Sequence, residues 1–158
     1  MYQRMLLPFD GSPAAERGLR EAIALAVDQH AALRIVHIID LHPLLMGATS
    51  SVSYEGLQRT MREYGQAMVN KAARTASEAG IAVETALREA TPGERTAEAI
   101  LAEAADSGCD LMVMGTHGRR GLSRWMLGSD AELVARSSPI PVLLVKPPDA
   151  AALHQAHP

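Results

Sequence analysis

Short apolar runs alternate with amphipathic helical patterns along the chain, and this alternation limits the fold more than any other feature of the sequence. Four of the runs are rich in branched residues and almost uninterrupted, as is typical of strands buried on both faces of a parallel sheet; they span residues 5–9, 33–39, 111–114 and 142–145. A fifth run, 81–88, carries Glu84 and Arg88 on one face and predicts a less buried strand at a sheet edge. The alternation predicts an α/β fold with a single open, doubly wound sheet of five parallel strands.

The first helical pattern covers about 13–29 and has a clear start signal. Ser12 suits the N-cap position, and Pro13 suits the first turn because its missing N–H would be unpaired there anyway. The connection that follows the second strand, 41–53, is the only long one inside the domain. With Pro43, one glycine and three serines, it predicts a mobile loop rather than a helix.

The later helices are recognised by their ends. The second helix is expected to end at Gly80 and the third near Gly108, because glycine adopts the left-handed conformation that closes a helix. The fourth helix is expected to begin at Ser129, which with Glu132 fits the S-x-x-E capping box.

The strands and helices all fall within residues 1–147, which predicts one domain for a chain of 158 residues. Residues 148–158 contain prolines, histidines and an alanine run, with too little apolar surface to bury, and predict a flexible tail. The single cysteine, Cys109, cannot form an intramolecular disulfide. No apolar run is long enough to cross a bilayer, and the first residues meet Pro8 and Asp10 too early for a signal peptide. We therefore expect a cytoplasmic protein without membrane insertion.

The net charge of −3 and the absence of a basic block argue against nucleic acid as a partner. Common enzyme signatures are also missing. The loop after the first strand has no G-x-G-x-x-G, neither lysine belongs to a Walker A loop, and the sequence contains no H-E-x-x-H or G-x-S-x-G.

A glycine-rich segment follows the fourth predicted strand. Four glycines and three arginines lie between Gly115 and the helix that starts at Ser129. Glycine permits positive φ angles and lets an anion approach backbone N–H groups closely, and a helix N-terminus offers unpaired N–H groups. These features together predict a cradle for a polyphosphate.

The spacing Gly115-x2-Gly118-x9-Gly128-Ser129 resembles the G-2x-G-9x-G-(S/T) motif of nucleotide-binding universal stress proteins. Three further segments are similar to the first, second and last strands of that family: 6–12, 36–40 and 139–145. The resemblance implies a Rossmann-like, adenine-nucleotide α-hydrolase-like sheet with strand order 3-2-1-4-5. It also implies ATP as the ligand, with Mg²⁺ or Mn²⁺.

The resemblance further implies roles for individual residues. Asp10 would face the adenosine, Pro8 would shape the same rim, and the backbone of Ile38 would read the adenine edge. Met114 and Gly115 would lie near the ribose. The phosphates would be held by Gly118, Gly128 and Ser129, with His117, Arg119 and Asp130 as neighbours.

Asp130 departs from the family, in which small or apolar residues are familiar at this position. Its carboxylate would oppose phosphate unless a cation or an arginine lies between them.

Several of these residues have simpler alternatives. Asp10 could close an Asx turn, and Ser129 could serve only as a helix cap. His117 and the arginines could be ordinary loop surface. His37, Asp40 and His42 crowd one strand end but offer no convincing fourth ligand for a metal site, so the metal ligands are left unassigned.

The resemblance implies a nucleotide-responsive stress-resistance or regulatory factor. No catalytic residue is assigned, since no general base is held by a second group, and at most slow ATP hydrolysis is expected. Two alternatives stay open: a non-nucleotide homodimeric interaction module, and an adenylyl-transferring enzyme. The strand Val142–Val145 is apolar on both faces and would lie at a sheet edge, so a homodimer through it is also expected.

Overall fold

A computed structural model describes residues 1–47, 53–117 and 127–146. Residues 118–126 of the predicted phosphate cradle, which include Gly118 and Arg119, lie outside the described residues, as does the predicted tail 148–158.

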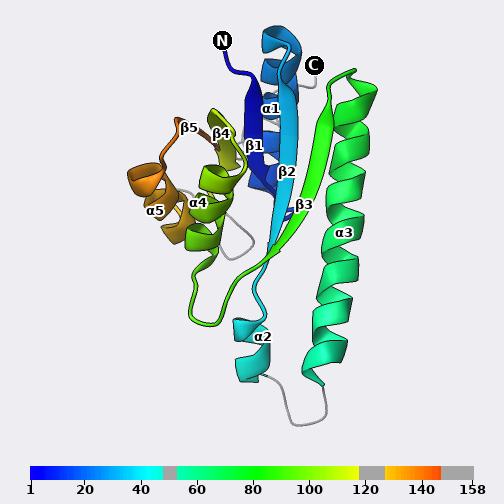
Figure 1. The fold of residues 1–158 in the computed structure, drawn as a ribbon, viewed down its shortest axis with the longest axis vertical. Helices are drawn as coiled ribbons and strands as arrows, with labels where there is room; N and C mark the ends of the chain where they lie inside the picture. Colours follow the sequence, from blue (N-terminus) through cyan, green and yellow to red (C-terminus); the bar gives the residue numbers. More distant parts are fainter. Residues whose placement is uncertain (48–52, 118–126, 147–158) are drawn as a thin grey trace, which may run out of the picture.

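Five parallel strands form one sheet in the order β3-β2-β1-β4-β5 (Figure 1), so the predicted fold class and strand order are confirmed. Their bounds lie within about two residues of the predicted runs: β1 (Arg4–Pro8), β2 (Ala32–Ile39), β3 (Val83–Glu89), β4 (Leu111–Gly115) and β5 (Val142–Val145).

Helices cover both faces of the sheet, each over its own apolar core. One core joins β-strand side chains such as Leu7 and Ile35 to α1 (Pro13–Gln29) and α3 (Tyr54–Glu78). The other joins Leu6 and Val36 to α4 (Thr96–Asp106) and α5 (Ser129–Ser137). The neighbouring strands β1 and β4 are therefore followed by helices on opposite faces of the sheet: α1 covers one face and α5 covers the other.

The predicted helix signals are confirmed for α1, α3 and α4. Ser12 is the N-cap of α1, and its Oγ accepts a hydrogen bond from Ala15 N at 3.1 Å. Gly80 and Gly108 follow the ends of α3 and α4 with φ angles of +80° and +64°. These positions need glycine because a side chain rarely adopts a positive φ.

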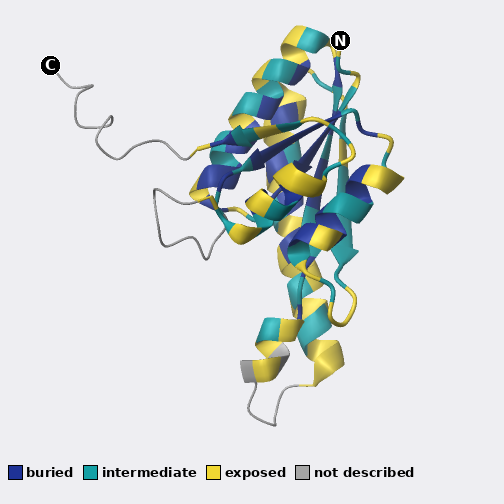
Figure 2. Cartoon of the chain, turned by 90° about the vertical axis from the view of Figure 1, so that its left-hand side faces the viewer, coloured by how far each residue is buried: buried dark blue, intermediate teal, exposed yellow. Residues whose placement is uncertain are grey.

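The expectation of a loop over 41–53 is wrong for residues His42–Gly47, which form a short helix, α2; residues 48–52 lie outside the described residues. Asp40 Oδ1 accepts a hydrogen bond from His42 N at 3.1 Å, which satisfies one N–H group at the start of the helix. Pro43 lies in the first turn, where it disrupts no helical hydrogen bond. Figure 2 shows α2 and the start of α3 extending away from the buried centre of the sheet.

The edge strand β3 is protected by charge, as its sequence predicts. Glu84 pairs with Arg4 and Arg34, and Arg34 also pairs with Glu103 of α4 at 2.7 Å. Arg88 pairs with Glu103 and Asp106, and its hydrogen bond to Asp106 raises the pKa of Arg88 above its ordinary value. Charged side chains on an edge strand discourage pairing with another chain.

Candidate functional site

Strand β1 ends before its neighbour β2 at the carboxyl edge of the sheet. Its register with β2 ends at Pro8 opposite Val36, whereas β2 continues to Ile39. The N–H and C=O of alternate residues in a strand point to the same neighbour. Ile39 C=O accepts from Ala90 N on the β3 side, so the N–H and C=O of Ile38 point to the opposite side, beyond the end of β1.

On the other side of β1 is the end of β4. Met112 N and Thr116 N donate to carbonyls on the β5 side, those of Pro141 and Val145. Successive residues of a strand direct their N–H and C=O to opposite neighbours, so Gly115, which precedes Thr116, directs its N–H and C=O toward β1. We call the end of β1 at Pro8, with the backbone of Ile38 on one side and that of Gly115 on the other, the β1 notch. It lies at the switch point of the doubly wound sheet, where ligands of such folds bind.

Gly115 is required there by close packing rather than by its backbone angle. A Cβ atom at this position would lie 2.7 Å from Ala14 Cβ and 2.8 Å from Ala14 C. Gly128 has a φ of −62°, and neither glycine is among the residues with positive φ. Of the two reasons considered for glycine in this motif, positive φ does not apply to Gly115 or Gly128; both instead permit a close approach of two backbone segments.

Asp10 forms the turn that leaves β1. Its Oδ1 accepts a hydrogen bond from Ser12 N at 2.9 Å, so the Asx turn considered as the alternative is present. Gly11, with φ of +73°, completes the change of direction. Asp10 is half-buried and directly follows the segment that ends at the β1 notch.

The turn after β1 contacts the end of β4. Ser12 Oγ donates to His117 O at 3.5 Å, a long hydrogen bond, and Thr116 Oγ1 lies 2.9 Å from His117 Nδ1. Gly128 N donates to Thr116 O at 2.9 Å, which brings the start of α5 to the end of β4. The two segments that carry the predicted site residues are thus joined around the β1 notch.

Helix α5 begins at Ser129, as predicted, but Ser129 is not its cap. Gly128 is the N-cap and Ser129 is the first helical residue, so the capping box between Ser129 and Glu132 is wrong. Gly128 already has the extended backbone of a cap, and its carbonyl accepts the first helical hydrogen bond from Glu132 N. Because Gly128 has no side chain, the N-cap residue itself caps none of the N–H groups of the first turn. Asp130 lies in that same turn and is half-buried.

The apolar residues predicted at the site contribute backbone more than side chain. Pro8 is buried, and Met114 is 7% exposed within the core under α4 and α5. Ile38 is half-buried and packs against the same core. Sequence reasoning missed the contacts of Ser12 and Thr116 with this region, although Ser12 stands in the first-turn segment and Thr116 inside the glycine motif.

The suspected metal ligands are not brought together. His37 Nδ1 lies 2.9 Å from Phe9 O, and Asp40 Oδ1 binds the backbone N–H of His42. Within residues 1–47, 53–117 and 127–146, no cluster of three or more His, Cys, Asp or Glu side chains could hold a metal ion.

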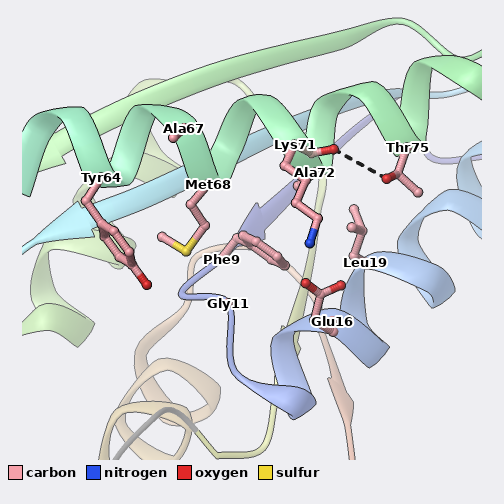
Figure 3. Close-up of a pocket in the computed structure, with 10 residues that line it drawn as sticks. All are labelled: Phe9, Gly11, Glu16, Leu19, Tyr64, Ala67, Met68, Lys71, Ala72 and Thr75. Atoms are coloured by element: carbon pink, nitrogen blue, oxygen red, sulfur yellow. Dashed lines mark hydrogen bonds between the residues drawn. The ribbon is translucent and has the colours of Figure 1, made fainter.

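A separate hollow of about 340 Å³ lies between α1 and α3 (Figure 3). Its floor is apolar, with Phe9, Leu19 and Met68, and polar atoms of Glu16 and Lys71 point toward it from the two helices. It lies on the α1 and α3 side of the sheet, whereas Gly128 and Ser129 lie at the start of α5.

The strand order and the helices on both faces define a doubly wound α/β protein. A family model described as the universal stress protein family matches residues 1–146, and the chain belongs to that family. Among the described residues, no helix is both long and apolar enough to cross a membrane.

Known relatives cover most of the chain. Universal stress protein MJ0531 of Methanocaldococcus jannaschii is 33% identical over 148 residues, which is 94% of this chain and 84% of the relative. The structure of MJ0577 from the same organism matches with a TM-score of 0.81 and 27% identity, over 95% of this chain and 99% of that one. A family member from Burkholderia pseudomallei matches with a TM-score of 0.74 and 31% identity, over 93% and 97% of the two chains.

Two more distant structures of the same fold contain adenine nucleotides. One is a universal stress protein in complex with cAMP, with a TM-score of 0.65 and 24% identity over 93% of this chain and 98% of that one. The other is a universal stress protein family member from Arabidopsis thaliana with AMP bound, with a TM-score of 0.67 and 14% identity over 94% of both chains.

Proposed function

We propose that this protein binds ATP in the β1 notch and acts as a nucleotide-responsive stress-resistance or regulatory factor. The observation that carries the proposal is the early end of β1, beyond which the backbone groups of Ile38 and Gly115 are both directed toward the β1 side at the switch point. Two proteins of the same fold contain cAMP and AMP, which supports an adenine nucleotide as the class of ligand.

The residues around the notch suit the parts of such a ligand. Ile38 presents one backbone donor and one acceptor side by side, which matches the acceptor and amino donor on the edge of adenine. Asp10, a carboxylate at the turn after β1, suits the ribose hydroxyls. The N–H group of Gly128 is already bonded to Thr116 O, so the phosphates would be bound by the N–H groups that follow it in the first turn of α5, from Ser129 onward.

A divalent cation, Mg²⁺ or Mn²⁺, would enter with the phosphates rather than through a preformed protein cluster. Within the described residues no three potential ligands converge, and Asp130 is the carboxylate nearest in sequence to the phosphate end. The role of the cation is to neutralise phosphate charge that would otherwise face Asp130.

Binding is tested with purified protein in two steps. Bound nucleotide is first identified by mass spectrometry after denaturation, and ATP is then titrated calorimetrically into the ligand-free protein with and without Mg²⁺. Asp10→Asn is the matched variant, because the amide oxygen still accepts from Ser12 N and preserves the Asx turn while the charge is lost. A ribose contact predicts weaker ATP binding in Asp10→Asn; unchanged affinity would reduce Asp10 to a turn residue. Wild-type protein that neither carries nor binds ATP would refute the proposed function.

The same titration separates the alternatives. A non-nucleotide interaction module would not bind ATP in any condition. An adenylyl-transferring enzyme would bind ATP and release pyrophosphate with a suitable acceptor, whereas slow hydrolysis would release inorganic phosphate and ADP. Product analysis after long incubation with Mg-ATP distinguishes these outcomes.

We also infer a homodimer through β5. This strand lies at a sheet edge, and Leu143 is 39% exposed, whereas the opposite edge, β3, is lined by charged pairs. An apolar edge strand with open backbone groups is an aggregation hazard unless a partner covers it, and a two-fold axis would cover both copies.

The dimer is tested by analytical ultracentrifugation of wild type and Leu143→Lys. Val145 is left unchanged because it is buried against the core under α1, where lysine would disturb the fold itself. A wild-type dimer that dissociates in Leu143→Lys supports the inference. A wild-type monomer at micromolar concentration, or an equally strong variant dimer, refutes it.

A further inference from the structure

We propose that His37 is a positioning residue for the β1 notch. Its imidazole donates a hydrogen bond to the carbonyl of Phe9, and the N–H of Ile38 is thereby left for the ligand. This inference rests on the proposed function and adds a residue to the same site. His37 belongs to none of the motifs that predict nucleotide binding, and the structure places it on the opposite face of β2 from Val36 and Ile38.

The pairing of β1 with β2 shows what His37 replaces. In a parallel ladder, a residue whose N–H and C=O point to the neighbouring strand bonds to two residues of that strand. Val36 therefore bonds to the residues on either side of Pro8, Leu7 and Phe9. Phe9 N donates to Val36 O at 2.8 Å. The next bond would run from Ile38 N to Phe9 O. Within the described chain the register stops at Pro8 and Val36, and that next bond is not formed.

The carbonyl of Phe9, to which Ile38 N would have donated, accepts a hydrogen bond from a side chain instead. His37 Nδ1 lies 2.9 Å from Phe9 O. A carbonyl oxygen only accepts, so Nδ1 carries the proton and donates to it. The hydrogen bond satisfies Phe9 O without extending the ladder, and β1 ends where the notch begins.

The imidazole is fixed in place by α3. Gly65 is buried, and a Cβ atom at that position would lie 2.8 Å from His37 Cδ2 and 3.2 Å from Leu87 Cδ2. The ring therefore lies between α3 and the end of β1, and it packs against α3 at Gly65, which has no side chain. A residue held this tightly by two elements is suited to positioning, because its hydrogen bond survives side-chain motion.

The released N–H has a consequence for base selection. The N–H and C=O of Ile38 point to the same side, and adenine offers the matching acceptor and amino donor on one edge. On the Watson–Crick edge, hypoxanthine and guanine carry a donor N–H and an acceptor oxygen where adenine carries an acceptor nitrogen and an amino donor. The N–H of Ile38 would then face a donor, and its C=O would face an acceptor. His37 thus favours an adenine base by keeping the Ile38 N–H unpaired in the free protein.

The first test uses amide hydrogen exchange in the ligand-free protein, followed by NMR. His37→Leu removes the donor at similar size, and His37→Asn keeps a donor two bonds from Cβ that can still reach Phe9 O. In wild type the Ile38 amide should exchange at least tenfold faster than the Val36 amide of the same strand, since only Val36 N is in the ladder. In His37→Leu the freed Phe9 carbonyl should accept from Ile38 N, and exchange at Ile38 should become slower. A loss of structure alone would make it faster, so unchanged or faster exchange overturns the proposal.

The second test measures ATP and ITP affinity by calorimetry for wild type and both variants. Loss of one backbone hydrogen bond to the base predicts about tenfold weaker ATP binding in His37→Leu. ITP binding should change less than twofold, and His37→Asn should restore both the ATP affinity and the preference for ATP over ITP. Equal losses for ATP and ITP would mean a general structural role and would overturn the proposal, as would failure of His37→Asn to restore binding.

The outcomes also separate this inference from the proposed function. Wild-type protein without ATP affinity removes the proposed nucleotide role, and the exchange test then decides alone whether His37 ends the ladder. Wild-type protein that binds ATP, together with a His37→Leu variant of equal affinity and equal ATP preference, removes only the role of His37.

Discussion

The two segments that flank the β1 notch are held by different kinds of interaction. The turn after β1 is local: Asp10 Oδ1 binds Ser12 N, and Ser12 Oγ caps α1 at Ala15 N. The end of β4 is held by residues far away in sequence, since Thr116 N binds Val145 O and Gly115 packs against Ala14.

This difference teaches where each half of the site can fail. A local turn loses one hydrogen bond when one side chain is changed, and the rest of the segment still folds the same way. A close approach between distant backbones fails when a single methyl group is added, because both segments must move. We expect the β4 side to be the more sensitive half of the site.

The largest effect is expected for Gly115→Ala. Its new Cβ would lie 2.7 Å from Ala14 Cβ and 2.8 Å from Ala14 C, and neither of these atoms can rotate away. The free energy of unfolding should fall by about 2 kcal/mol, as for other overpacked cores, and ATP affinity should fall with it. Urea denaturation and calorimetric titration measure the two effects.

Gly18→Ala is the matched control, in α1 directly across from the same strand end. A Cβ there would meet only ordinary contacts, 3.6 Å from Leu7 Cδ1 and 3.7 Å from Gly115 N. Because glycine is unfavourable inside a helix, this variant should gain about 0.5 kcal/mol of stability. Similar destabilisation of both variants would contradict the importance of close packing at Gly115.

The second effect is expected for Ser12→Ala on the local side. Loss of the cap should lower the free energy of unfolding by about 1 kcal/mol. Because Ser12 Oγ also donates to His117 O, ATP binding should weaken too. Thermal unfolding and titration measure both.

Ser53→Ala is the control for the cap itself. Ser53 caps α3 with a bond of the same length, 3.1 Å to Gly56 N, but it is exposed and makes no described contact with the notch. Its loss should lower stability only slightly and leave ATP affinity unchanged. If Ser53→Ala weakened ATP binding as much as Ser12→Ala, the coupling between the cap and the site would be disproved.

A third, smaller effect is expected for Gly128→Ala. The new Cβ would lie 3.1 Å from Thr116 O, which accepts the hydrogen bond of Gly128 N, so the start of α5 should shift by a few tenths of an ångström. ATP affinity should fall about fivefold, or roughly 1 kcal/mol, with little change in stability. Ser137→Ala, at the other end of α5, should leave affinity unchanged. Equal affinity in wild type and Gly128→Ala would remove the phosphate role of this helix start.

The smallest effect is expected for Asp130→Val. If the carboxylate opposes the phosphates, the variant should bind ATP about threefold more tightly in EDTA, with a smaller change in Mg²⁺. Glu132→Val is the control, because Glu132 is in the same turn but exposed and near Arg136 at 3.9 Å. Weaker Mg-ATP binding in Asp130→Val would instead make Asp130 part of the cation environment, and no change in either condition would mean that its carboxylate points away from the ligand.

Much of the fold could be predicted because its signals are local. The apolar runs predicted the five strands, and Ser12 followed by Pro13 predicted the start of α1. Charged residues on the run that contains Glu84 and Arg88 predicted an edge strand, and β3 lies at an edge. Each signal depends on periodicity or on neighbours a few residues apart, which a chain carries whatever it packs against.

Other features depend on segments that meet only in the folded chain. The sequence motif selected Gly115 and Gly128, but their contacts with Ala14 and Thr116 could not be predicted, and of the two reasons considered for them only close backbone approach applies. The cap of α5 shifted to Gly128 because Thr116 O binds its N–H and holds it in an extended conformation.

The sequence by itself determined the alternation of elements, the family motif and the candidate residues at the carboxyl ends of the strands. Only the tertiary structure decided where β1 stops relative to β2, and with it which way Ile38 directs its N–H and C=O. That boundary is set by the hydrogen bond between His37 and Phe9 and by the glycine of α3 that makes room for the imidazole. These groups are 28 residues or more apart in the chain, so neither propensity nor periodicity contains the contact.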